Sequence, residues 1–192
     1  DGPALALGVS ESTLIEMTGA FAGILNGGSS VTPYGLQSLT LKGMDEPLFG
    51  AGGGIGERVI SEGAARALTY MMTEVLESGT GRRALLDDRP AAGKTGTTQS
   101  ARDAWFVGFT ADYVVGVWMG YDDNSPLTGV TGGGLPAEIW HEVMSRINEG
   151  VDASPLLTEI PDSTYVPIDP STGEGAIAPE DVPFFDAPIA PA

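Results

Sequence analysis

Residues 88–123 read DRPAAGKTGTTQSARDAWFVGFTADYVVGVWMGYDD, and this stretch decides the fold. It holds three candidate strands, at 93–99, 104–109 and 113–121. The second and third are apolar along their length instead of alternating, which is typical of strands covered on both faces. The link 110–112 has hairpin length, so these two strands are expected to be antiparallel neighbours. The stretch therefore predicts an α+β fold, in which helices cover both faces of an antiparallel sheet.

Amphipathic segments on either side of this stretch supply the helices. Thr13 and Glu16 have capping-box spacing, so a first helix is expected to begin there and to end before Asn26. Apolar residues at helical spacing predict a second helix over about 61–77 and a third over 135–148. The single histidine of the chain falls in the third helix and is expected to be solvated there.

The sequence divides into a globular part at 1–150 and an acidic, proline-rich tail at 151–192. The tail carries eight acids, eight prolines and no base, so we expect it to be extended, either disordered or lying along a surface, to lack regular helix and to depart from the core after about 150. Within the globular part, residues 35–41 predict a strand, and the glycine-rich run 50–56 predicts a flexible loop.

The composition excludes several classes of function. A net charge of −17 argues against nucleic-acid binding, because such a surface repels phosphates. The chain has no cysteine and one histidine, His141, so neither a thiolate nor a multi-histidine metal site is expected, and no cofactor is implied. No stretch approaches the roughly 20 apolar residues that span a bilayer.

The chemistry is concentrated around Lys94, one of only two lysines in the chain. In an extended strand, Thr95 and Thr97 lie two residues apart and point to the same face, so their hydroxyls could together hold a carboxylate. Lys94 points to the opposite face, although its long stem can reach around a strand edge. Gly96 would allow another chain to approach closely.

Two other interpretations of this motif compete. A phosphate-binding P-loop ending in Gly-Lys-Thr would need a glycine at position 88, where the chain has Asp88, and an acid there would repel phosphate. The plainer alternative is an edge strand that carries a solvated lysine. Three residues alone would favour this alternative, but the surrounding sequence favours a functional motif.

The stretch 88–123 resembles the transpeptidase domain of class A, bifunctional penicillin-binding proteins. The resemblance covers about residues 4–150, with support at 5–11, 21–28, 77–82 and 131–133. In that family, the motifs S-x-x-K, S-x-N and K-T-G build the site. The first serine attacks the D-Ala-D-Ala end of a peptidoglycan stem peptide, and an amine of a second stem resolves the acyl-enzyme. β-Lactams trap the same serine.

Two of these three motifs do not occur in the chain. The positions where S-x-x-K or S-x-N would need a serine hold Leu39, Ala91, Ile24, Asp122 and Arg146. The family order places both motifs upstream, so we expect a missing N-terminal part of the same enzyme to be the partner. We expect the chain to be inactive on its own.

The resemblance also implies roles for individual residues. Lys94 and Thr97 would be catalytic, Lys94 through its charge and Thr97 through one oxyanion donor, its N–H. Thr95, Gly96, Thr97 and the weaker candidate Thr98 would bind substrate or a β-lactam. The parent protein would act at the periplasmic or extracytoplasmic side, anchored to the inner membrane by an upstream segment. A non-catalytic binding or regulatory module that keeps the fold is the alternative.

Overall fold

The structure is a computed structural model that describes residues 11–50 and 54–159. One compact unit runs to Glu159, beyond the boundary expected at 150. Its helices are α1 (Leu14–Leu25), α2 (Glu62–Glu77) and α3 (Leu135–Ile147), with short 3-10 turns η2 (Arg82–Ala84) and η3 (Gln99–Ala101). Its strands are β1 (Ser29–Thr32), β2 (Ser38–Leu39), β3 (Phe49–Gly50), β4 (Gly54–Arg58), β5 (Ala92–Thr97), β6 (Asp103–Phe109) and β7 (Val114–Gly120).

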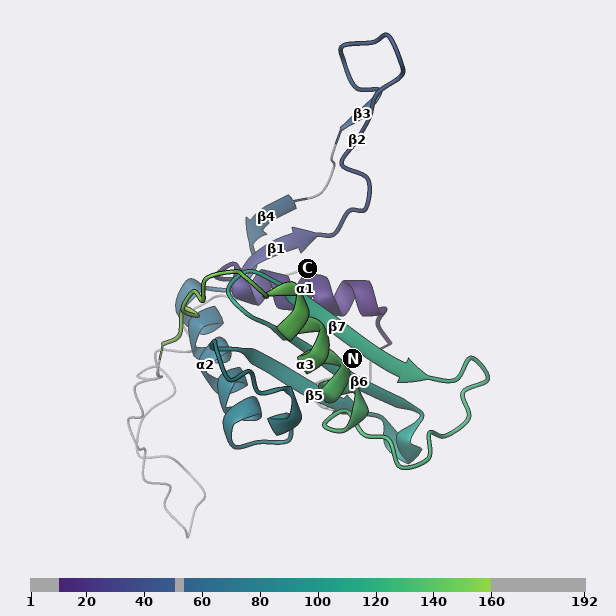
Figure 1. The fold of residues 1–192 in the computed structure, drawn as a ribbon, viewed down its shortest axis with the longest axis vertical. Coiled ribbons are helices and arrows are strands. Elements are labelled where there is room, and N and C mark those ends of the chain that lie inside the picture. Colours follow the sequence, from purple (N-terminus) through teal and green to yellow (C-terminus); the bar gives the residue numbers. More distant parts are fainter. Residues whose placement is uncertain (1–10, 51–53, 160–192) are drawn as a thin grey trace, which may run out of the picture. The chain divides into compact units, whose positions relative to one another are not determined.

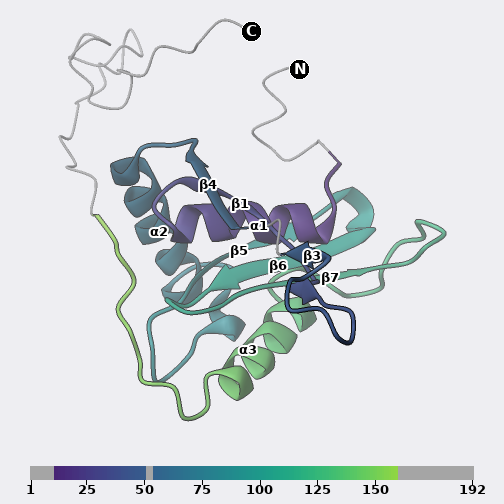
Figure 2. The same cartoon turned by 90° about the horizontal axis from the view of Figure 1, so that it is seen from above.

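The main sheet has the antiparallel order β5-β6-β7, as the sequence predicts (Figure 1). Helices α1 and α3 cover opposite faces of it (Figure 2). Side chains alternate between the two faces of the sheet along β7, which explains this cover. Val115 packs against the group of buried core residues that contains Trp140 of α3. The next residue, Gly116, faces α1, because a Cβ added to it would contact Leu14. The expected strand pairing and two-sided cover are both confirmed.

The core is built around Trp140, which is fully buried. Its ring lies 5.2 Å from that of Phe106 on β6, centroid to centroid, and its Nε1–H donates to the carbonyl of Val115 at 3.1 Å. A buried indole needs such an acceptor, and the bond ties α3 to β7. A Cβ on Gly108 would lie 3.0 Å from the indole, so a glycine there lets the helix approach the sheet.

The helix boundaries follow the expected signals. Thr13 accepts from the Glu16 N–H, and the Glu16 carboxylate accepts from the Thr13 N–H at 2.8 Å, which completes the capping box at α1. These bonds lower the pKa of Glu16. Ser61 caps α2. No helix in the described part of the chain is both long and apolar enough to cross a membrane.

The segment between α1 and α2 differs from its prediction. The sequence predicts a strand over 35–41 and a loop over 50–56, but only β2 falls in the first range, paired with β3. The first part of β4 falls in the second range, and β4 pairs with β1. All residues of β4 are exposed, so no apolar alternation marks it in the sequence. Residues 51–53 of the expected loop lie outside the described residues.

The first residues after α3 contact the core in extended form, which is one of the two forms expected of the tail, and they do not depart from the core at 150. Residues 151–159 form no helix or strand, but Leu156 is buried against Met72, Ala92 and Phe109. Burying an apolar side chain stabilises this contact by about 1.5–3 kcal/mol, which explains why the segment stays on the core. Residues 160–192 of the expected tail lie outside the described residues. His141, which was expected to be solvated, is half-buried, with Nδ1 2.9 Å from the Leu85 carbonyl oxygen.

Arg89 joins the approach to β5 to the end of α3. Its side chain is 5% exposed and donates to the side chain of Asn148 at 2.8 Å and to the carbonyl of Val151 at 2.9 Å. It also binds the exposed carboxylate of Asp88 and lowers the pKa of that group. Because the pKa of Asp88 is lower in the folded state, this pair stabilises the fold above pH 3.8 and is lost as the pH falls further.

Arg89→Ala should lower the free energy of unfolding by about 3 kcal/mol, because it leaves Asn148 and a backbone carbonyl without their donor. Arg146→Ala is the control, since Arg146 is 76% exposed and, within the described part of the chain, pairs with Glu142 of its own helix alone. It should change the stability by less than about 0.5 kcal/mol. Urea unfolding of the two variants measures the difference. Equal midpoints would show that Arg89 does not anchor β5.

Candidate functional site

The Lys-Thr-Gly motif lies on β5, the last strand on one side of the sheet. The N–H of Thr98 donates to the carbonyl of Asp103 at 3.0 Å. Because bonding residues alternate in an antiparallel ladder, Gly96 also faces β6, whereas the N–H and C=O groups of Thr95 and Thr97 face the outer edge. That edge has no strand partner among the described residues. The Thr97 N–H, which the resemblance implies is one of the oxyanion donors, therefore points out of the sheet at this edge.

Lys94 reaches the same outer edge. Its side chain is exposed, and its Nζ donates to the carbonyl of Thr95 at 2.9 Å. The sequence places its Cα–Cβ bond on the face opposite to the threonines, and the long stem brings the ammonium group back to the edge. The positive charge therefore lies at the free edge of β5.

The hydroxyls of Thr95 and Thr97 each have a partner from a different loop. Thr95 Oγ1 lies 2.7 Å from Thr80 Oγ1, in the turn that follows α2. Thr97 Oγ1 accepts from the N–H of Gly132 at 3.0 Å, in the connection between β7 and α3. We use the name hydroxyl cluster for the three threonine hydroxyls of Thr80, Thr95 and Thr97 together with the Gly132 N–H that donates to one of them.

The loop 131–133 can approach β5 only because it is built from small residues. A Cβ on Gly132 would lie 2.8 Å from the backbone N of Gly96 and would also clash with the carbonyls of Gly96 and Trp105. A Cβ on Gly133 would clash with the carbonyl of Thr80. The two glycines therefore bring the loop into backbone contact with both β5 and the turn after α2.

Thr98 holds the end of β5 in place. Its hydroxyl accepts from the N–H of Asp103 at 2.8 Å and donates to the Asp103 carboxylate at 3.1 Å. The other carboxylate oxygen accepts from Trp118 Nε1–H on β7 at 3.0 Å. The single proton of Thr98 is thus used within the sheet. The neighbouring Arg102 donates to the carbonyl of Asn124.

Comparison with known proteins places this arrangement in a family. The family model "Penicillin binding protein transpeptidase domain" matches residues 3–145. The chain belongs to this family. Penicillin-binding protein 1A of Pseudomonas aeruginosa is 40% identical over 124 residues, which are 62% of this chain and 15% of that protein. Penicillin-binding protein 1A of Aquifex aeolicus is 34% identical over 147 residues, 74% of this chain and 20% of that protein.

Solved structures of penicillin-binding proteins share the fold. PonA1 of Mycobacterium tuberculosis superposes with a TM-score of 0.71 at 27% identity, over 93% of this chain and 50% of that one. Penicillin-binding protein 1A of Haemophilus influenzae gives 0.69 at 27% identity, over 82% of this chain and 29% of that one. The class A resemblance and the transpeptidase-like fold are confirmed. The chain spans only about a fifth of the curated relatives' length.

Sequence reasoning about this penicillin-binding transpeptidase chain missed two members of the hydroxyl cluster. Thr80 and Gly132 lie in stretches 77–82 and 131–133, which support the resemblance but were given no role. A threonine or a glycine in a connecting loop carries no pattern of its own. Only the packing of both loops against β5 shows that they belong together.

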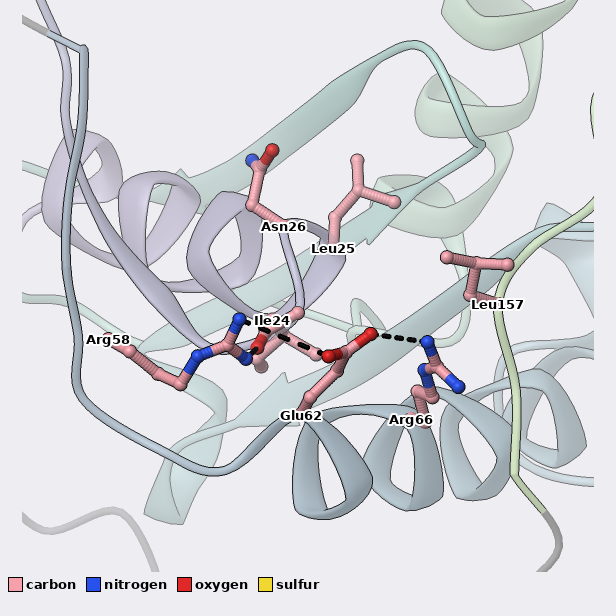
Figure 3. Close-up of a pocket in the computed structure, with 8 residues that line it drawn as sticks. Ile24, Leu25, Asn26, Arg58, Glu62, Arg66 and Leu157 are labelled. Atoms are coloured by element: carbon pink, nitrogen blue, oxygen red, sulfur yellow. Dashed lines mark hydrogen bonds and ion pairs between the residues drawn. The ribbon is translucent and has the colours of Figure 1, made fainter.

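A hollow among the described residues lies elsewhere. It has a volume of about 230 Å³ and is lined by residues of α1, β4 and α2 and by Leu157 (Figure 3). Glu62 lies between Arg58 and Arg66 and pairs with both, which offsets one of their two positive charges. It contains no residue of β5 and no group suited to nucleophilic attack. We therefore place the candidate site at the edge of β5, not in this hollow.

Gly132→Ala should push the loop 131–133 away from β5 and destabilise the fold by about 1–3 kcal/mol, the usual cost of overpacking. Gly35→Ala is the control, because a Cβ there has no atom within 4 Å. Thermal unfolding and amide exchange at Gly96 and Thr98, whose N–H groups face β6, measure the effect. Unchanged stability in the Gly132 variant would show that the loop does not pack on the strand as described.

Proposed function

We propose that this chain supplies the K-T-G strand of a peptidoglycan D,D-transpeptidase, and that the serine nucleophile belongs to a segment outside this sequence. The observation that carries the proposal is the free edge of β5, where the Thr97 N–H, the threonine hydroxyls and the Lys94 charge lie together. Membership of the penicillin-binding transpeptidase family supports the reaction class.

The substrate would lie along β5 as an added strand. An extended peptide can pair with the outward N–H and C=O groups of Thr95 and Thr97, as peptides do at other open sheet edges. Its terminal D-Ala carboxylate would accept from the two threonine hydroxyls, and Lys94 would attract its charge. Gly96 would leave clearance for the peptide backbone. Thr98 would keep the end of the strand in position through Asp103.

The reaction would proceed by acyl transfer. The serine Oγ of the other segment attacks the carbonyl carbon of the penultimate D-Ala and gives up its proton to a base in that segment. The Thr97 N–H donates to the oxyanion. The C–N bond breaks, and terminal D-Ala leaves with a proton on its nitrogen. An amine of a second stem then attacks the ester, forms the cross-link and returns the proton to the serine. A β-lactam would acylate the same serine in the first step and would remain attached to it as an ester.

The proposed partner is the part of the same enzyme that carries S-x-x-K and S-x-N. The curated relatives are several times longer than this chain, which leaves room for such a segment. The outer edge of β7 has no strand partner among the described residues, and Trp118 and Tyr121 beside it are exposed. This edge suits pairing with a strand of that segment. The assembled enzyme would act at the extracytoplasmic side, anchored upstream.

The chain alone should form no covalent adduct with a fluorescent penicillin. Co-expressed with a class A segment that carries S-x-x-K and S-x-N, it should allow that segment to be labelled. Lys94→Ala and Thr97→Val should each slow labelling by about 10- to 100-fold, since a hydrogen bond to a charged group contributes about 1.5–3 kcal/mol. Intact-mass measurement and gel fluorescence give the site and rate.

Lys42→Ala is the matched control, because Lys42 is the other lysine of the chain. Its side chain is exposed, and it is distant from β5 in the sequence. It should label at the rate of the unchanged protein. A penicilloyl adduct on the chain alone would contradict the assignment of the nucleophile. Assembly without labelling would favour the non-catalytic binding module instead.

A further inference from the structure

We infer that Thr80 and the backbone N–H of Gly132 are positioning groups, which orient the Thr95 and Thr97 hydroxyls so that both present a proton to a carboxylate. The inference rests on the proposed function, because it concerns the same carboxylate subsite. It assigns a role to two loops, 77–82 and 131–133, that the K-T-G motif itself does not include.

The polarity of the Thr97 hydroxyl is fixed by its partner. A hydroxyl carries one proton and two acceptor sites, whereas a backbone N–H can only donate. In the 3.0 Å contact with Gly132, Thr97 Oγ1 must therefore be the acceptor. Its own proton remains free for another acceptor. Since Gly132 is buried and held by backbone contacts, its N–H is a rigid reference for that orientation.

The polarity of Thr95 can be set by its ligand. Thr80 and Thr95 share one hydrogen bond of 2.7 Å, and either hydroxyl can be its donor. An ionised carboxylate only accepts. A carboxylate at Thr95 therefore selects the arrangement in which Thr80 donates to Thr95 and Thr95 donates to the ligand. Without the Thr80 hydroxyl, the Thr95 oxygen would lose the hydrogen bond that it accepts.

The turn that carries Thr80 is fixed well enough to do this. The N–H of Gly81 donates to the carbonyl of Val75 at 2.8 Å, and that of Gly79 donates to Glu74 at 2.9 Å. A Cβ on Gly81 would lie 3.1 Å from the ring of Phe106. Gly133 packs on the carbonyl of Thr80 from the other side. The turn, the loop and β5 therefore form one packed unit.

This arrangement predicts selectivity for an acid over an amide. A carboxylate can take protons from both threonines and is attracted by Lys94. A primary amide has one acceptor oxygen, carries no charge, and brings an NH₂ group that cannot accept from a hydroxyl. The site should thus bind a peptide with a free C-terminus better than the same peptide with an amidated C-terminus.

The test is an NMR titration of the full 192-residue chain with N-acetyl-D-alanyl-D-alanine and with its C-terminal amide. The amide signals of Thr97 and Gly132 should shift with the acid. Thr80→Val should weaken binding of the acid about 5- to 30-fold, the loss expected for one hydrogen bond in a charged network, and should leave the weak binding of the amide nearly unchanged. Thr80→Ser should restore the acid affinity to within about twofold, since it restores the hydroxyl.

Two controls separate positioning from folding. Thr128→Val removes an exposed hydroxyl from the connection between β7 and α3 and should leave both affinities unchanged. Without ligand, Thr97→Val should shift the Gly132 amide signal and speed its exchange, and Thr97→Ser should not. Unaltered signals from β6 and α3 will show that each variant is folded.

The outcomes distinguish this inference from the proposed function. Suppose that the unchanged chain binds the acid in preference to the amide at β5, and that the Thr80→Val variant binds the acid with the same affinity. The positioning role is then wrong and the proposed function stands. If the unchanged chain shows no preference for the acid at Thr97 and Gly132, the carboxylate subsite itself is wrong, and the inference fails with it.

Discussion

The hydrogen-bond ladder between β5 and β6 is the constraint on which the rest of the site depends. It fixes which backbone groups of β5 are used inside the sheet and which face outward. Because Thr98 pairs with Asp103, the N–H and C=O groups of Thr95 and Thr97 must face the free edge. A shift of one residue would turn these groups inward and move both threonine side chains to the other face. The hydrogen bonds that join Thr98 to Asp103 and Asp103 to Trp118 oppose such a shift.

Packing on the two faces of the sheet then holds this edge in place. Trp140 of α3 fills one side and bonds to the carbonyl of Val115, while α1 lies close over Gly116 on the other. Arg89 connects the start of β5 to the end of α3. The glycines of loop 131–133 allow direct backbone contact with β5. The site is thus a set of polar groups on a strand whose neighbours leave it little freedom, as preorganised binding requires.

The strands and helices could be predicted because their signals are local. Unbroken apolar runs marked β6 and β7, and the capping box at Thr13 marked α1. The short strands between α1 and α2 could not, because they pair through backbone hydrogen bonds and the side chains of β2, β3 and β4 face solvent. Leu156 looked like part of a polar tail, and its burial depends on an apolar surface built by α2, β5 and β6. At the site, Lys94, Thr95 and Thr97 follow from one motif, whereas Thr80 and Gly132 join it only through tertiary packing.

The decisive experiment is a crystal structure of the chain assembled with its nucleophile-bearing segment and acylated by penicillin. The penicillin carboxylate should accept hydrogen bonds from the Oγ1 atoms of Thr95 and Thr97, and these two hydroxyls should keep their hydrogen bonds to Thr80 and Gly132. The acyl carbonyl oxygen should accept from the Thr97 N–H. A carboxylate bound away from β5, for example between Arg58 and Arg66, would contradict the account.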